Sequence, residues 1–528
     1  MTDQLSSGSQ LPSVNLSSKS GVLPPWEVAE LPEPLPFSIR NAFKIIGPGA
    51  IMLAASIGGG EWLIGPATVI KHGPGVLWIA TVAIVLQLIF NLEGIRYTLY
   101  TGEPAISGIM RLKPGCRFWG GTYVLLTAMQ LGVPALAPAT AVTVFGMMMD
   151  RVPVEAPSVK EIAHADESGD AAVATEHAQQ RERAVSDRGT LLLITYGIIA
   201  ITLMILMFGG TIERMLEYSS WLMIGYIFLF LISVNLWFVP GEIWIGTLRG
   251  FFEFGNWPTG VEPLLMATFF ATAGSGGIGN LTISNWVRDK GFGMGAVVGA
   301  IPSAVGGKQI HLSHVGKVFA ITADNMRRWR IWWRYVVIDQ VWVWAAGCFF
   351  GMFLNVNLAR AIIPHGTDLS KIGAGAFQAQ YMAEHFWRGL WLLGLLNGFW
   401  ILFSTQLGNT DVLVRTLTDT LWTASSRVRS WRAGSIAKVY YSLLLVFSAW
   451  GLIAVHLGSA MTLFKYLGTM AGVVMAIASV QLYLVNTRLL PRELQPSWWR
   501  KAALLICSLA YGTMSVVAGY DVVSKWFA

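Results

Sequence analysis

The chain has 528 residues, of which 54% are hydrophobic and only 13% are charged, whereas a typical soluble domain carries about 25% charged residues. The apolar residues form blocks of about 20, the length that crosses the hydrocarbon core of a bilayer. The composition excludes a soluble globular protein and predicts an all-α polytopic membrane protein. The net charge of +7 then reflects loop topology rather than a nucleic-acid surface.

The sequence has none of the common motifs of enzymes or zinc proteins. Its three cysteines, Cys116, Cys348 and Cys507, are scattered and lack CxxC or disulfide-framework spacing. It contains no nucleotide-binding loop and no nucleophile elbow. We expect no enzymatic activity and no cofactor. The expected partners are the bilayer and a transported small solute or cation, without nucleic acid, and the oligomeric state is not defined by the sequence.

The N-terminal residues do not form a signal peptide. Residues 1–36 are rich in Ser and Pro, carry acids, and lack a basic start followed by an apolar core. We predict that residues 1–40 form a disordered cytoplasmic tail.

Eleven membrane spans are predicted from the apolar blocks. They lie at about 44–70, 75–100, 119–148, 190–208, 220–240, 262–288, 331–355, 387–408, 437–457, 462–486 and 502–524. With the N-terminus inside, inner segments hold 24 of the 37 Lys and Arg residues and outer segments hold 10. This bias predicts a plasma or inner membrane protein with its N-terminus in the cytoplasm and its C-terminus outside. A hydrophilic insert at 150–188 is expected to be a flexible or partly helical outer loop.

Span 1 contains an interruption, Ser56-Ile57-Gly58-Gly59-Gly60-Glu61-Trp62. Each glycine costs a helix about 1 kcal/mol relative to alanine, and a charge at bilayer depth costs about 3 kcal/mol or more on insertion scales. Lipid cannot satisfy an opened backbone, so a broken helix must face protein or a water-filled cavity. We interpret this stretch as a functional site.

Span 6 contains a matching interruption, Ser275-Gly276-Gly277-Ile278-Gly279-Asn280. At a constant offset of 219 residues it aligns with the first interruption, and Asn280 takes the position of Glu61 in this alignment. Paired glycine-interrupted spans are typical of inverted-repeat secondary transporters, in which the substrate lies where the broken helices meet. We therefore predict a core at 41–490, with repeats at about 43–240 and 260–488, and an extra helix in 491–528. Glycine for close helix packing is the alternative.

A cluster of Arg and Trp residues, Arg327-Arg328-Trp329-Arg330-Ile331-Trp332-Trp333-Arg334, precedes span 7. We interpret it as an interfacial anchor, with the arginines at the headgroups. The alternative is a specific site for an anionic lipid.

The chain resembles the Nramp family of divalent-metal transporters from about residue 43 to 490. The likeness lies in Gly47-Pro48-Gly49 before span 1, Trp62 after its interruption, Asn280-Leu281 in span 6, Phe403–Thr410 in span 8 and Asn486–Leu490 after span 10. The resemblance implies a LeuT-type fold of two inverted five-helix repeats and transport of a metal cation.

The departures from the family pattern fall on the metal-binding motifs. Aligned through Trp62, Gly58 takes the place of the metal-binding Asp of span 1, and Glu61 takes that of the Asn. In span 6, Gly277 and Gly279 replace the Met and His. The thioether that favours soft metals is thus missing. Span 3 also lacks the acid that serves the proton path in the family, which puts proton coupling in doubt.

Other polar residues in the spans have two interpretations each. Glu93 and Arg96 are three apart on one helix face, as in a structural ion pair, with an inner gate as the alternative. Asp339 is a candidate proton relay, or it pairs with a cation or a backbone group. Residues Gln406, Asn409 and Thr410 fall in the segment that the resemblance places along the ion path; interhelical hydrogen bonding is the alternative.

We predict a secondary transporter that moves a hard divalent cation such as magnesium or manganese, with ion or proton coupling as an open part of the prediction. The alternatives are a LeuT-type symporter for a small amino or carboxylic acid and, from another class, a channel or a transporter-like receptor. The candidate binding residues are Ser56, Gly58, Gly60, Glu61, Ser275, Gly277, Gly279, Asn280 and Thr282. Of these, Glu61 and Asn280 are the candidate metal ligands, because carboxylate and amide oxygens suit hard cations.

Overall fold

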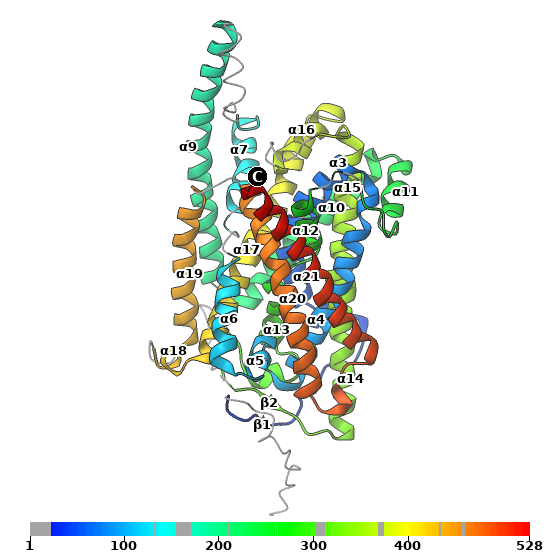
Figure 1. The fold of residues 1–528 in the computed structure, drawn as a ribbon, viewed down its shortest axis with the longest axis vertical. Helices are drawn as coiled ribbons and strands as arrows, with labels where there is room; N and C mark the ends of the chain where they lie inside the picture. Colours follow the sequence, from blue (N-terminus) through cyan, green and yellow to red (C-terminus); the bar gives the residue numbers. More distant parts are fainter. Residues whose placement is uncertain are drawn as a thin grey trace, which may run out of the picture.

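The computed structural model describes residues 23–130, 134, 136–154, 171–208, 211–258, 260, 262–302, 312–313, 315–367, 374–431, 435–456 and 460–527. The described chain forms a nearly all-helical bundle (Figure 1). Its two short strands, β1 (Glu27–Val28) and β2 (Lys317–Val318), pair in parallel at one end of the bundle.

The first half of the chain runs from the N-terminal strand to the short helix after span 5. Its helices are α1 (Ile39–Ile45), α2 (Pro48–Ser56), η1 (Gly58–Ile64), α3 (Gly65–His72), η2 (Pro74–Val76), α4 (Trp78–Thr101), α5 (Ala105–Met110), α6 (Cys116–Ala128), α7 (Leu136–Met149), α9 (Ala171–Met207), α10 (Ile212–Phe238) and α11 (Gly241–Gly250).

The second half begins with the two short helices of span 6. Its helices are α12 (Pro263–Thr272), α13 (Ile278–Lys290), η4 (Gly293–Val297), α14 (Ala323–Ile338), η5 (Asp339–Ala345), α15 (Ala346–Ile362), α16 (Ala374–His385), α17 (Leu390–Ala424), α18 (Ser426–Ser430), α19 (Ile436–Ala454), α20 (Ala460–Arg488), η7 (Arg492–Leu494) and α21 (Trp498–Phe527).

Nine helical segments of the described chain are long and apolar enough to cross a membrane. They correspond to the predicted spans 1, 2, 4, 5 and 7–11. Spans 3 and 6 are each made of two shorter helices, α6 with α7 and α12 with α13. The polytopic helical fold is thus confirmed, whereas the division into two repeats stays a prediction.

The bundle is organised around α17, the helix of span 8. It packs against α2, α10 and α13, and on its other sides against α6, α7, α16 and α19 (Figure 1). Asn397, Asp411 and Arg415 of this helix are fully buried, so polar groups continue along the centre of the bundle. Helices α20 and α21 lie together and close the side formed by α4 and α12.

The prediction of a disordered tail at residues 1–40 is wrong for residues 23–40. Residues 23–37, which we call the strap, run across the β1–β2 end of the bundle, and α1 follows. Trp26 is buried under the guanidinium of Arg111, whose Cζ lies 4.7 Å from the ring centroid. Arg328 pairs with Glu30 at 2.8 Å. The prediction overlooked the few apolar residues, among them Trp26, that fix a polar segment once the helices provide a surface. Residues 1–22 lie outside the described part.

The hydrophilic insert becomes helical where it is described. Residues 171–188 form the start of α9, which projects beyond the rest of the bundle (Figure 1). Arg151 pairs with Asp187 at 2.6 Å across the base of the insert. The strap and the end of α21 lie at opposite ends of the molecule (Figure 1), as an odd number of crossings requires. Which end faces the cytoplasm stays a prediction.

Candidate functional site

The interruption of span 1 differs from the opened backbone that we predicted. Gly58–Ile64 form a π-helix, η1, so the chain stays helical through the three glycines. Such single π-turns are frequent at functional sites. The N–H of Gly58 donates to Thr405 Oγ1 of α17 at 2.9 Å, and a side chain at Gly58 would meet that hydroxyl. The glycines therefore bring span 1 into backbone contact with span 8.

Span 6 is broken. Ala273–Gly277 separate α12 from α13, and Gly274, Gly276 and Gly277 have φ of 100°, 72° and 64°. Residues with a Cβ rarely adopt these backbone conformations. A Cβ at Gly60 of η1 would lie 2.3 Å from the carbonyl oxygen of Thr272, so the two interrupted spans touch at the break.

Gln87 of α4 holds the break in place, and the sequence analysis did not identify it. Its Oε1 accepts from the N–H groups of Ser275 and Gly276 at 2.9 and 3.1 Å. Its Nε2 donates to Ala273 O and to Tyr511 Oη, both at 2.8 Å. The available signal was a lone amide in the apolar run of span 2, because polar residues in spans commonly bond across helices.

A cavity of about 40 Å³ lies between the two interruptions and α17. The predicted site residues Ser56, Ser275 and Gly279 line it, as does Asn409. Gln130, Thr272 and Thr405 add further polar atoms that the sequence analysis did not assign. The lining holds hydroxyl, amide and backbone groups and no ionisable side chain among the described residues. Such a volume accommodates an ion or a water molecule.

Glu61 is fully buried beside this cavity rather than in its wall. Its Oε1 accepts from the N–H of Gly274 at 3.0 Å, so the carboxylate of span 1 bonds to the break of span 6. Its Oε2 has no hydrogen-bond partner in the described structure. The thiol of Cys348 from α15 also lies against the Glu61 carboxyl group. An unpaired buried carboxylate oxygen is costly, and functional sites commonly retain such groups.

Asn280 lies on the opposite side of the break and bonds to span 2. Its Nδ2 donates to Gln87 Oε1 at 3.1 Å and to Asn91 Oδ1 at 2.9 Å, which leaves Oδ1 unpaired. Neither Asn280 nor Glu61 lines the cavity, and the described residues contain no cluster of three or more His, Cys, Asp or Glu side chains that could hold a metal. Metal ligation by this pair therefore stays a prediction.

The remaining residues of the predicted set have packing contacts. Thr282 Oγ1 lies 2.8 Å from Thr416 Oγ1 of α17. Gly277 packs against Gln130 and Ala471, so a side chain there would clash.

The three predicted residues of span 8 do not act as one group. Asn409 Nδ2 donates to Ala55 O at 2.8 Å and lines the cavity. Gln406 and Thr410 bond to each other and line a separate small void beside α9 and α19. They thus line a different space from Asn409, although all three residues lie on the same helix. Only Asn409 belongs to the central cavity.

Asp339 serves a structural purpose in this conformation. Its Oδ1 accepts from the N–H of Gly47 at 3.0 Å and its Oδ2 from the N–H of Gly49 at 2.7 Å. The carboxylate thus satisfies free donors at the start of α2, where a helix dipole favours negative charge. This contact is the backbone pairing that we named as the alternative to a proton relay.

Glu93 and Arg96 form the predicted ion pair, at 2.7 Å. Arg500 of α21 also pairs with Glu93, at 3.0 Å, and Asn486 of α20 donates to it. The group fastens spans 2, 10 and 11 together at one end of the bundle, away from the central cavity, which favours the structural interpretation over a gate.

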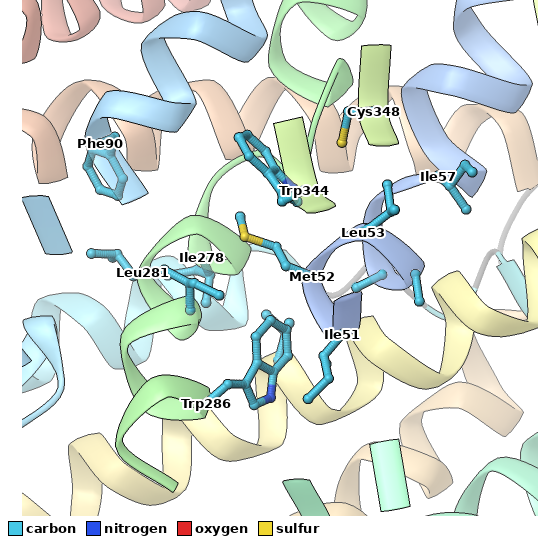
Figure 2. Close-up of a cluster of buried hydrophobic side chains, with 14 of the residues drawn as sticks. Ile51, Met52, Leu53, Ile57, Phe90, Ile278, Leu281, Trp286, Trp344 and Cys348 are labelled. Carbon is cyan, nitrogen blue, oxygen red and sulfur yellow. The ribbon is translucent and has the colours of Figure 1, made fainter. Parts of the chain in front are cut away.

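Apolar side chains pack around α2, the first half of span 1. Figure 2 shows Met52 and Leu53 of α2 between Trp344 and Cys348 of span 7 and Ile278 and Trp286 of α13. This packing excludes water from the helix that precedes η1.

Comparisons with solved structures identify the fold. No model of a known protein family matches the chain, and no curated protein matches it in sequence. The manganese transporter of Eremococcus coleocola in complex with an aromatic bis-isothiourea substituted compound matches with a TM-score of 0.59 and 12% identity, over 98% of this chain and 92% of that chain. A mutant of that transporter matches with a TM-score of 0.60 and 13% identity, over the same shares. MhsT in complex with L-phenylalanine reaches only 0.48, with 13% identity over 90% of this chain and 98% of that chain. The likeness to the manganese transporter confirms the predicted LeuT-type fold of a polytopic membrane protein.

Proposed function

We propose that this protein is a secondary transporter, related to the Nramp family, that carries a small hard cation. The observation that supports this most is the Glu61–Gly274 hydrogen bond, through which the buried carboxylate of one interrupted span holds the broken backbone of the other. Substrate binding between two interrupted spans is the arrangement expected of an alternating-access transporter.

The size and chemistry of the cavity support a cation as the cargo. Its polar atoms are oxygens and amide nitrogens, and no sulfur lines it among the described residues. Hard cations such as Mg²⁺ and Mn²⁺ prefer oxygen ligands. Glu61 Oε2, which has no hydrogen-bond partner in the described structure and lies beside the cavity, is a further oxygen ligand that a cation entering the break would meet.

The test is uptake of Mg²⁺ and Mn²⁺ into proteoliposomes by the wild-type chain and by Glu61→Gln. We expect the variant to insert and fold but to lose at least about tenfold in uptake, since one charge-assisted contact is worth 1.5–3 kcal/mol. Glu242→Gln, at an exposed site on α11, is the matched control and should transport normally. Excess Cd²⁺ should compete poorly. Wild-type uptake rates in Glu61→Gln would refute the proposed role.

A small organic acid is the second candidate, favoured by one observation. No ionisable side chain of the described residues lines the cavity, and α13 begins at its edge, where the backbone donors of a helix N-terminus suit a carboxylate. At 40 Å³ the cavity is too small for an amino acid in this conformation. Accumulation of amino or carboxylic acids, without Mg²⁺ or Mn²⁺ uptake, would establish this alternative.

A further inference from the structure

A long apolar groove runs along the outside of the bundle between α10 and the η5–α15 segment. It has a volume of about 870 Å³ and is separate from the central cavity. Trp221, Ile224, Phe228 and Ile232 form one wall from a single face of α10. The opposite wall extends from Ile338 to Leu354, about 24 Å at 1.5 Å per residue, which is most of the hydrocarbon thickness.

The end of the groove on the strap side is closed by α1 and the last residue of the strap. The side chains of Phe37, Ile39 and Phe43 line the groove at this end and are exposed on the outside of the bundle. Arg40 and Lys44, four residues apart, share a neighbouring face of α1. A short helix with adjacent apolar and basic faces is suited to the boundary between headgroups and acyl chains.

Three exposed cations lie around this end of the groove, and none of them has an acidic partner in the part of the chain that the structure describes. Arg334 Cζ lies 5.5 Å from the ring centroid of Phe37, and Arg40 and Lys44 follow Phe37 on α1. The described residues contain no ion pair to Arg40, Lys44 or Arg334.

Two arginines of the same basic segment differ from these three. Arg327 pairs with Glu33 and Asp324, and Arg328 pairs with Glu30 and Asp324. Arg330 has no ion pair among the described residues, but its Nε donates to the backbone oxygen of Met326. Arg334, at the mouth of the groove, therefore differs from Arg327 and Arg328 in having no acidic partner in the described structure.

We propose that this groove binds one anionic glycerophospholipid. An acyl chain lies between α10 and η5–α15, and the phosphate-bearing headgroup meets Arg40, Lys44 and Arg334. The chemistry fits because basic groups beside a membrane attract anionic headgroups, while the groove offers an acyl chain an apolar wall. Leu53 of α2 also lines the groove, so the bound lipid contacts span 1 three residues before Ser56.

The experiment is native mass spectrometry of the purified, delipidated protein after incubation with equal amounts of phosphatidylglycerol and phosphatidylcholine. We expect phosphatidylglycerol to be retained about tenfold over phosphatidylcholine, because each basic group near the headgroup contributes to binding. Inorganic phosphate in excess should not displace it, since phosphate lacks the acyl chain. Displacement by phosphate would instead identify a simple anion site and overturn the proposal.

Two variants test the basic headgroup site and the apolar groove separately, and a third serves as the control. The triple variant Arg40→Gln, Lys44→Gln, Arg334→Gln should retain both lipids about equally. Ala346→Trp fills the groove and should reduce retention of both lipids. Arg327→Gln, in the same basic segment but already ion-paired, is the control and should behave like the wild type. An unchanged preference in the triple variant, or unchanged retention in Ala346→Trp, would overturn the proposal. Neither readout depends on cargo transport, so the lipid-binding proposal is tested independently of the proposed function.

Discussion

At the scale of single residues, the amide of Gln87 replaces the helical hydrogen bonds that the break in span 6 removes. It bonds to the backbone of Ala273, Ser275 and Gly276 and to the side chain of Asn280. The sequence predicted Glu61, Ser56 and Ser275 as site residues through the glycine pattern around them. It could not predict Gln87, because this contact joins residues nearly 190 positions apart and leaves no local pattern.

Replacing Gln87 with leucine should destabilise the break and impair transport. The N–H groups of Ser275 and Gly276 would lose their acceptor, at about 1–3 kcal/mol for each buried group left unpaired. Thermal unfolding in detergent and cation uptake would measure the effect. Thr81→Val is the control, since it removes one bond from the same helix to Phe251 O, far from the break. Equal stability of the two variants would contradict the role given to Gln87.

At the scale of elements, the two glycine-rich interruptions have different structures despite their similar sequences. The hydropathy pattern predicted where the spans lie, and the composition predicted that they are helical. It could not distinguish the π-helix of Gly58–Ile64 from the break at Ala273–Gly277. That difference depends on partners that are distant in the sequence. Thr405 Oγ1 accepts a hydrogen bond from the N–H of Gly58, whereas Gln87 Oε1 accepts one from the N–H of Ser275 in the break.

Substituting alanine at Gly276 tests the break. Gly276 has φ of 72°, and an added Cβ would lie 2.3 Å from Ala271 O, a backbone atom that cannot move freely. The left-handed conformation alone costs a residue with a side chain about 1–2 kcal/mol, so we expect a loss of at least about 2 kcal/mol in unfolding free energy. Gly225→Ala, in open space on α10, should instead stabilise by up to about 1 kcal/mol. Similar melting temperatures for the two variants would refute this account.

At the scale of the whole molecule, the strap links parts of the chain that the sequence showed only as tail and loops. Arg111 donates to Pro24 O and to the buried carboxylate of Glu103, which also accepts from the N–H of Gly316. Burial alone would raise the pKa of Glu103, but Arg111 and the hydrogen bonds from Tyr97 and Gly316 hold it below its usual value. The order of residues 23–37 was unpredictable because it depends on this assembled surface.

Replacing Arg111 with methionine should free the strap and leave Glu103 buried without its cation. Breaking a buried pair in this way costs about 3–5 kcal/mol. Because the folded pKa is depressed, the wild-type pair contributes fully above the ordinary value of 4.5 and loses that contribution as pH falls below it. The measurements are thermal unfolding across pH and limited proteolysis near Trp26. Arg327→Gln removes only exposed pairs and should cost under about 1 kcal/mol; an equal loss there would argue against the Arg111 anchor.

The hydroxyl of Tyr511 has a consequence for the smallest working form of this protein. Tyr511 lies on α21, the helix beyond the ten of the predicted repeats, yet it accepts a hydrogen bond from Gln87 and packs on Phe270 of α12 with ring centroids 4.5 Å apart. The eleventh helix is thus part of the support of the candidate site. A version trimmed to ten helices would keep every predicted binding residue and still lose the geometry of the break, so efforts to minimise or circularly permute the chain must retain α21.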